Sequence, residues 1–293
     1  MERRWAIHLV TVQVLILVCA PSDGAAFDYP WPRQQAAGDT LAERIAPPAG
    51  FTRISAIEGS FADWMRGLPL REPGAAVRFF DGRKKSDQSG AFAVVDIDVG
   101  TRDFQQCADA IMRLRAEYLL AAGCADTIRF NFSSGHAARW LDWRAGLRPL
   151  VSGRKVSWVL RAEEDSSYSA FREYLDTVFL YAGTYSLSKE MEPVTDPAAV
   201  LPGDVFIQGD FPGHAVLVAD VAEDELGQRI FLLLQSFMPA QDIHVLMNPA
   251  RPGTPWYAAF KNGKLETPDW TFSYRDLRRF TQPDCTVSDS EGA

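Results

Sequence analysis

Three residues that lie far apart in the chain could together carry out thiol chemistry. Cys107 follows Gln105 and Gln106 at the start of an amphipathic segment, His214 opens an apolar segment, and Gln235 ends the next one. A thiol at a helix start faces unpaired backbone N–H groups and the positive end of the helix dipole, which favour the thiolate. His214 could accept the thiol proton, and an amide oxygen on Gln235 would fix the imidazole tautomer. This set predicts nucleophilic attack on a carbonyl, with Gln105 or Gln106 and the Cys107 N–H as donors to the oxyanion.

The same residues have a structural interpretation. A free cysteine on the apolar face of a helix is usually a small core residue, and a strand histidine is as often structural as catalytic. In that case the chain has no nucleophile at this place. The sequence leaves both interpretations open.

The four cysteines constrain one another. Cys107 and Cys124 stand at opposite ends of a predicted helix and would be about 25 Å apart, whereas a disulfide needs Cα atoms within about 7 Å. A bridge between Cys124 and Cys285 is possible. It would leave Cys107 as the free thiol in an oxidising compartment.

The elements that must position these residues follow from periodicity and turn signals. Asp103 with Gln106, and Gly123, indicate the two ends of a helix over residues 104–122. A second amphipathic helix is expected over 168–181. Strands are expected at 77–80 paired with 91–99, and at 128–132, 156–160, 204–207, 214–221 and 229–235. An antiparallel sheet after a helical first half predicts an α+β fold.

The N-terminus has the pattern of a secretory signal. Met1-Glu2-Arg3-Arg4 precedes an apolar run over residues 5–20, and small residues precede Phe27, so we expect a signal peptide over 1–26. Lipidation at Cys19 is disfavoured because Val18 before it is not small. We expect an extended lead-in segment over 27–48, a single globular domain over 49–281 and a disordered tail over 282–293. The expected location is the periplasm or cell envelope, with no integral membrane segment after signal removal.

Composition excludes several classes of partner. The net charge is −8, the pI is about 5.1, and the one basic cluster is Arg83-Lys84-Lys85. Nucleic-acid binding is therefore not expected, because it needs an extended basic surface. The chain has no His-Glu-x-x-His, no Cys-x-x-Cys and no dinucleotide fingerprint, so we expect neither a metal nor a cofactor.

The stretch from His214 to Phe237 resembles the second half of papain-like cysteine peptidases, in which a His-Ala-Val strand precedes a strand ending in an amide residue, Ser and an aromatic residue. The resemblance implies a papain-like arrangement, with a nucleophile helix at Cys107 packed on an antiparallel sheet, and extra N-terminal strands and helices. It departs from the family in having Gln235 in place of Asn and no Gly-Ser-Cys-Trp around Cys107. We expect the binding cleft to include Ser236, Gln241, His244 and Tyr181. For His244 the alternative is a solvent-facing strand position.

Over nearly its whole mature length the chain also resembles a bacterial family described as domain of unknown function 4846. The residues that carry this resemblance are Gln105-Gln106-Cys107-Ala108-Asp109-Ala110, Arg113-Leu114-Arg115-Ala116-Glu117-Tyr118, Tyr181-Ala182-Gly183-Thr184, Gly203-Asp204-Val205-Phe206, Gly213-His214-Ala215-Val216 and Gln235-Ser236-Phe237-Met238-Pro239-Ala240-Gln241. This resemblance implies no particular activity.

The sequence thus predicts an exported papain-like thiol hydrolase or amidase acting on a peptide, with cell-wall peptide as the most accessible substrate. Cys107 would be the nucleophile and His214 the base. The alternative is a non-catalytic envelope protein of the same fold that binds a peptide or a glycan.

Overall fold

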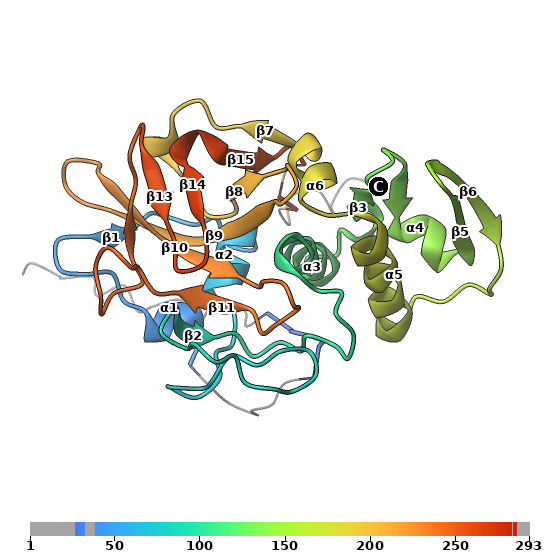
Figure 1. The fold of residues 1–293 in the computed structure, drawn as a ribbon, viewed down its shortest axis with the longest axis horizontal. Coiled ribbons are helices and arrows are strands. Elements are labelled where there is room, and N and C mark those ends of the chain that lie inside the picture. Colours follow the sequence, from blue (N-terminus) through green and yellow to red (C-terminus); the bar gives the residue numbers. More distant parts are fainter. Residues whose placement is uncertain (1–26, 33–38, 283, 286–293) are drawn as a thin grey trace, which may run out of the picture.

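The fold was analysed in a computed structural model that describes residues 27–32, 39–282 and 284–285. The expected signal peptide and Cys19 lie outside the described residues. The main feature is a nine-stranded antiparallel sheet (Figure 1). Helices and a strand hairpin lie at one side of this sheet, so the chain has the predicted α+β fold.

Seven strands of the sheet run in the order β2-β11-β10-β9-β8-β15-β7, while β1 pairs with β9 and β12 with β10. Their bounds are β1 Thr52–Arg53, β2 Ala91–Val94, β7 Met191–Pro193, β8 Val205–Gln208, β9 His214–Glu223, β10 Arg229–Gln235, β11 His244–Leu246, β12 Tyr257–Ala258 and β15 Leu277–Phe280. Three hairpins stand outside the sheet: β3 Arg129–Asn131 with β4 Ala137–Arg139, β5 Leu147–Ser152 with β6 Lys155–Leu160, and β13 Lys264–Glu266 with β14 Thr271–Ser273.

The α-helices are α1 Leu41–Arg44, α2 Phe61–Arg66, α3 Cys107–Ala121, α4 Trp140–Arg144, α5 Tyr168–Tyr181 and α6 Thr184–Glu190. Short 3₁₀ turns are η1 Ala125–Thr127, η2 Pro197–Ala199 and η3 Tyr274–Asp276. Helix α3 packs on β9 and β10 and also contacts α5 and α6. It therefore lies between the sheet and the part of the molecule built from α4, α5 and the β5–β6 hairpin (Figure 1).

The central strands are buried on both faces, which explains why their sequences are almost continuously apolar. Alternate residues of β9 contribute to two separate apolar clusters. Ala215 and Leu217 face the cluster that includes α3, while Val216 and Val218 face the cluster that includes the β13–β14 hairpin. Because side chains alternate along a strand, β9 holds the two layers together.

A β-bulge interrupts the pairing of β9 with β10. Asp220 pairs with Leu232 and Val218 with Leu233, so Ala219 is an extra residue. Asp220 is fully buried and binds two arginines, Arg53 at 2.6 Å and Arg66 at 2.8 Å. These two ion pairs link β1 and α2 to β9.

Helix α3 is buried over most of its length, including charged residues. Arg113 contacts Glu117, Gln105 and, at 2.6 Å, the carboxylate of Asp98. Glu117 in turn accepts a hydrogen bond of 2.7 Å from the Tyr168 hydroxyl on α5. Arg113 and Glu117 thus have charged or polar partners within α3 and on the segments around it, as burial of charge requires.

Most expected elements are present. The helix over 168–181 and the strand over 229–235 have the predicted bounds, and the strands near 128–132, 156–160, 204–207 and 214–221 are confirmed with shifts of one or two residues. The helix predicted from residue 104 begins at Cys107, because Gln106 is its N-cap and the Gln106 N–H donates to Asp109 Oδ2 at 3.0 Å.

The predicted pairing of 77–80 with 91–99 is wrong. Strand β2 pairs with β11 instead, and residues 77–80 make only isolated bridges, Arg78 to Lys84 and Phe79 to Gln241. The carbonyl and N–H of Val77 are instead bound by the Gln88 side chain.

The two ends of the described chain pack on the domain. Tyr29 and Trp31 are buried, and the Trp31 indole donates to the Asp96 carbonyl at 2.7 Å, so this part of the lead-in segment is not a free linker. At the other end the expected disordered tail is corrected for its first residues. Asp284 binds Arg115 at 2.6 Å, and Cys285 forms a disulfide with Cys124. Within the described residues, no helix is long and apolar enough to cross a membrane.

Candidate functional site

Cys107 is the first residue of α3 and lies in a cavity. The cavity has a volume of about 410 Å³. Its wall comes from the start of α3, the α5–α6 junction, the loop between β8 and β9, and Met238 after β10. Cys107 is the free cysteine of the described chain, because Cys124 and Cys285 are bonded to each other. The prediction of a free thiol at this position is confirmed.

The environment of the Cys107 sulfur favours the neutral thiol. Burial and the neighbouring Asp109 carboxyl raise the thiol pKa to about 11, although backbone N–H groups of Ala108, Ala215 and Cys107 itself act in the opposite direction. The predicted shift toward thiolate is therefore wrong: the backbone donors are present as expected, but desolvation raises the thiol pKa by more than they lower it. The Ala215 N–H is one of these groups, which places the sulfur near the first residues of β9, although the His214 side chain does not line the cavity.

His214 is the first residue of β9 and is 1% exposed. Its ring is surrounded by Phe237, Trp270 and Phe272, with ring centroids 4.8, 5.4 and 5.8 Å away. Burial lowers the pKa of His214 to about 4, despite the opposing effects of the Gln235 hydrogen bond and the Asp269 charge. The imidazole is therefore neutral near pH 7 and has one nitrogen available to accept a proton.

A chain of polar contacts fixes the state of that ring. His214 Nε2 lies 2.8 Å from Gln235 Oε1, Gln235 Nε2 donates to Asp269 Oδ2 at 2.7 Å, and Lys85 Nζ binds the same carboxylate at 3.1 Å. A carboxylate only accepts hydrogen bonds, so the amide nitrogen must face Asp269 and the amide oxygen must face His214. Nε2 therefore carries the proton, and Nδ1 is the free acceptor.

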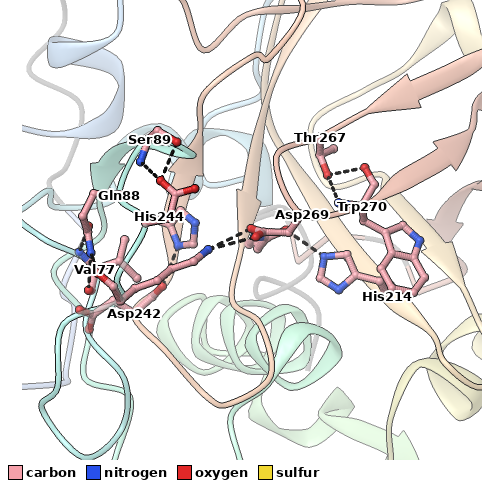
Figure 2. A network of polar contacts seen from close by, with 12 residues as sticks. Val77, Gln88, Ser89, His214, Asp242, His244, Thr267, Asp269 and Trp270 are labelled. Atoms are coloured by element: carbon pink, nitrogen blue, oxygen red, sulfur yellow. Dashed lines mark hydrogen bonds and ion pairs between the residues drawn. The ribbon is translucent and has the colours of Figure 1, made fainter.

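Asp269 is held by the turn between β13 and β14. The N–H of Thr267 donates to the Trp270 carbonyl at 2.8 Å, and the Trp270 N–H donates to the Thr267 hydroxyl at 3.1 Å. Figure 2 shows Asp269 between His214 and His244, with Trp270 beside His214. One short turn thus provides both the carboxylate that orients Gln235 and an aromatic ring that covers His214.

The two glutamines before Cys107 have different surroundings. Gln106 lines the cavity, and its amide nitrogen donates to Asp103 at 3.1 Å. Gln105 is buried outside the cavity wall, and its amide oxygen accepts from Arg113 at 2.7 Å. Its amide nitrogen has no hydrogen-bond partner among the described residues. Gln106 is therefore the side chain that can reach a ligand in this cavity.

Ser236 and Gln241 support the site and do not line it. The Ser236 hydroxyl lies within hydrogen-bond distance of the carbonyls of Gln105, at 3.1 Å, and Gln241, at 2.8 Å, and can donate its one proton to either. This hydroxyl links the segment before Cys107 to the segment after Gln235. Both side chains are almost completely buried and neither lines the Cys107 cavity, so the contacts that they make are structural.

His244 and Tyr181 also lie outside the Cys107 cavity. His244 pairs with Gln235 across β10 and β11, is 1% exposed, and its Nδ1 lies 2.9 Å from the Asp242 carbonyl. Its burial contradicts the solvent-facing alternative, and it does not line the Cys107 cavity. Tyr181 lines a different hollow, together with the β3–β4 loop and the β5–β6 hairpin.

Sequence reasoning missed several residues of the site. Lys85 and Asp269 are far from His214 in the chain, and only the folded turn brings them together. Asp109 lies two residues after Cys107 and lines the same cavity. Burial holds its pKa well above the ordinary range, and its Oδ1 has no partner among the described residues. In the sequence, the feature that could have indicated Asp109 as a site residue is its position two residues after Cys107.

The site has no donor set for a metal ion. Within the part of the chain that the structure describes, no three His, Cys, Asp or Glu side chains are grouped closely enough to hold one. The polar contacts around His214 are hydrogen bonds among imidazole, amide and carboxylate, with one ion pair to Lys85.

Comparisons with other proteins give one match. No curated protein and no solved structure matches this chain. A family model described as domain of unknown function (4846) matches residues 41–279, which run from the start of α1 into β15 and include Cys107, His214, Gln235 and Asp269. The chain therefore belongs to the family of domain of unknown function 4846.

Proposed function

We propose that the protein is a papain-like thiol hydrolase or amidase in which Cys107 is the nucleophile and His214 is the general base. The observation that carries the proposal is the fixed state of His214. Asp269 orients Gln235, Gln235 accepts from Nε2–H, and Nδ1 remains as an acceptor. The Cys107 sulfur lies against the backbone of the next residue, Ala215.

In the proposed reaction the sulfur of Cys107 attacks the carbonyl carbon of an amide while His214 Nδ1 accepts the thiol proton. The tetrahedral oxyanion receives hydrogen bonds from the Cys107 N–H and the Gln106 side chain. The C–N bond then breaks, the amine leaves with the proton from His214, and a thioester remains. Water, deprotonated by His214, hydrolyses this thioester and restores the thiol.

In the resting protein Cys107 is a neutral thiol and His214 is a neutral imidazole, because burial raises the pKa of the thiol and lowers the pKa of the imidazole. Proton transfer must therefore accompany attack, since a preformed thiolate–imidazolium pair is disfavoured in this environment. The bound substrate then helps to activate Cys107, because it displaces solvent and positions its carbonyl for attack.

The rim of the cavity indicates the kind of substrate. Leu180, Phe211 and Met238 line the cavity and are exposed by 54%, 100% and 61%. They come from three separate segments: the end of α5, the β8–β9 loop and the segment after β10. Large exposed apolar side chains gathered around one hollow favour contact with an apolar group of a ligand. A peptide with an apolar side chain beside the scissile amide fits this rim.

We further propose that the protein is exported and acts on peptides of the cell wall. The Cys124–Cys285 disulfide supports an oxidising compartment, and the N-terminal signal pattern supports the same location. Intact-mass measurement on envelope material tests this step. Loss of about 26 residues, with Phe27 as the new N-terminus, is expected, and Met1 on a cytosolic protein would contradict it.

The catalytic proposal is tested with peptidyl electrophiles and cell-wall peptides. The mature protein should form a covalent adduct at Cys107 with a peptidyl vinyl sulfone, and should release new amino groups from peptide amides. Cys107→Ser should abolish both, and His214→Ala should reduce both by a factor of about 100 or more. His136→Ala is the matched control, because His136 is an exposed histidine outside the cavity.

A second candidate function is a binding protein that uses the same cavity without catalysis. The raised pKa of Cys107 favours it, because a thiol at about 11 is a poor nucleophile at neutral pH. Peptide binding that persists in Cys107→Ser, without any adduct or turnover in the native protein, would establish this function in place of the hydrolase.

A further inference from the structure

A second hollow lies on the other side of the junction between α5 and α6. It has a volume of about 470 Å³ and is formed by the β3–β4 loop, the β5–β6 hairpin and the start of α6. Tyr181 and Tyr185 line this hollow, while the residues between them, Ala182 to Thr184, line the Cys107 cavity. The five-residue segment 181–185 therefore separates two ligand-sized spaces.

The floor of this hollow is a built aromatic layer. Phe132 packs against Tyr181 with centroids 5.1 Å apart, and against Trp158 of β6 with centroids 6.2 Å apart. Tyr185 is 55% exposed at the rim. Valines 151 and 156 complete the apolar wall. Such a surface offers flat faces for the C–H groups of a ring-shaped ligand.

Several polar side chains of the hollow have no protein partner within the described part of the chain, whereas the Ser134 hydroxyl lies 3.1 Å from His136 Nδ1. The guanidinium of Arg154 and the hydroxyls of Tyr181 and Tyr185 make no hydrogen bond or ion pair within the described part of the chain. Ser133 adds a hydroxyl at the same wall, and Lys189 lies over the Tyr185 ring at 5.7 Å. Among the described residues, no carboxylate lines the hollow.

We propose that this hollow binds an acidic saccharide, meaning a sugar that carries a carboxylate. Arg154 would hold the carboxylate with two parallel hydrogen bonds, which its planar guanidinium favours. The tyrosine rings would pack on the sugar face, and their hydroxyls with Ser133 would bind its oxygens. The chain has a net charge of −8, yet the charged side chain among the described residues that line this hollow is Arg154. The hollow therefore favours an anionic ligand.

The position of the hollow beside the Cys107 cavity connects its ligand with the proposed reaction. A saccharide bound against Tyr185 would place a peptide attached to it near the α5–α6 junction and the mouth of the Cys107 cavity. This last step rests on the proposed hydrolase function. Saccharide binding itself does not depend on it.

The test measures binding in the Cys107→Ser variant of the whole mature chain, so that turnover plays no part. Isothermal titration uses trigalacturonic acid and N-acetylmuramic acid as acidic probes, and the N-acetylglucosamine trimer as the neutral probe. At least one acidic probe should bind at least about tenfold more tightly than the neutral trimer, and added salt should weaken this binding. A preference for the first probe indicates a uronic acid polysaccharide as the source of the ligand, and a preference for the second indicates a muramic sugar.

Two variants on the exposed surface locate the binding. Arg154→Gln should weaken acidic-probe binding at least about tenfold, and Tyr185→Ala should weaken it by a similar factor. Lys155→Gln is the matched control, because Lys155 is the neighbouring cation of the same hairpin and does not line the hollow. The proposal is overturned if neither acidic probe binds at millimolar concentration, if the neutral trimer binds as well, or if Arg154→Gln and Lys155→Gln behave alike. If the native protein shows no peptide turnover while the acidic sugar still binds, only the hydrolase proposal is contradicted.

Discussion

Gln235 Nε2 donates to Asp269 Oδ2 at 2.7 Å, and this bond determines which atom of the amide faces His214. Without the carboxylate, the amide could turn and present its N–H groups to the imidazole. His214 would then need its proton on Nδ1, and the nitrogen expected to accept the thiol proton would be lost. The residue that sets the chemistry of His214 is therefore two hydrogen bonds away from it.

The first prediction follows from this relationship. ¹⁵N NMR should find His214 as the Nε2–H tautomer in the native protein and as a mixture of tautomers in Asp269→Ala. Lys85→Met is the control, because it removes the ion pair to Asp269 and leaves the acceptor for Gln235 in place. A single Nε2–H tautomer in Asp269→Ala would show that the carboxylate does not orient Gln235.

The second prediction concerns the reactivity of Cys107 in the absence of substrate. With a thiol pKa raised to about 11, alkylation by iodoacetamide at pH 7.5 should be at least about 100-fold slower in the folded protein than in urea. Asp109→Asn should speed it, because the Asp109 charge raises that pKa. His214→Ala should leave the pH profile unchanged, since a neutral imidazole provides no charge. Fast alkylation at pH 6.5 that depends on His214 would contradict the neutral resting pair.

The third prediction is a pH dependence of stability caused by His244. Burial lowers the pKa of His244 from 6.5 to about 4, so between these values the unfolded chain binds a proton that the folded chain does not. The free energy of unfolding must therefore fall as the pH falls through this range, by about 3 kcal/mol in total for one such group. In His244→Gln the slope between pH 6 and pH 4.5 should decrease relative to the native protein. Urea titrations at several pH values measure this, and equal slopes would refute the contribution of His244.

The fourth prediction concerns the buried ion pairs of Asp220. Asp220→Asn should destabilise the protein by about 3–5 kcal/mol, because it leaves Arg53 and Arg66 without a charged partner in a buried place. Asp196→Asn removes an exposed pair with Lys261 and should have no measurable effect. Thermal denaturation of the two variants makes the comparison, and equal midpoints would show that the two Asp220 pairs add nothing.

The fifth prediction concerns the disulfide. Its two cysteines are separated by 161 residues, so the chain-entropy relation gives a stabilisation of up to about 5 kcal/mol. Cys124→Ser with Cys285→Ser should unfold at lower urea than the native protein, and a reducing agent should reproduce the effect in the native protein only. Mass mapping without reduction should find Cys107 alkylated only after unfolding and Cys124 linked to Cys285.

The sequence was sufficient for elements with a strong local pattern. Helix α5 has the predicted bounds because Ser167 caps it and its apolar residues follow helical spacing. The central strands were found because they are apolar on both faces. Residues 77–80 have the composition of a strand, but their backbone is bound by Gln88 and by distant segments, and no local pattern records this.

The candidate site was predictable where its residues lie at the ends of strong elements. Cys107, His214 and Gln235 each begin or end a helix or strand, and the last two are in contact as expected. The roles of Asp269, Lys85 and Asp109 depend on distances across the fold or on burial, which no spacing in the sequence expresses. Desolvation also reverses the expected shift of the Cys107 pKa, because the degree of burial is a property of the whole fold.

The bulge in β9 has a consequence for chain length. Ala219 has no partner on β10, while the residues on either side of it, Val218 and Asp220, pair with consecutive residues of that strand. A variant that lacks Ala219 could keep every other pair of this ladder, with His214 still at the start of β9 and Asp220 still opposite Leu232. Relatives one residue shorter at this point are therefore compatible with the same site, whereas the loss of any residue between His214 and Val218 would turn the histidine to the opposite face of the sheet.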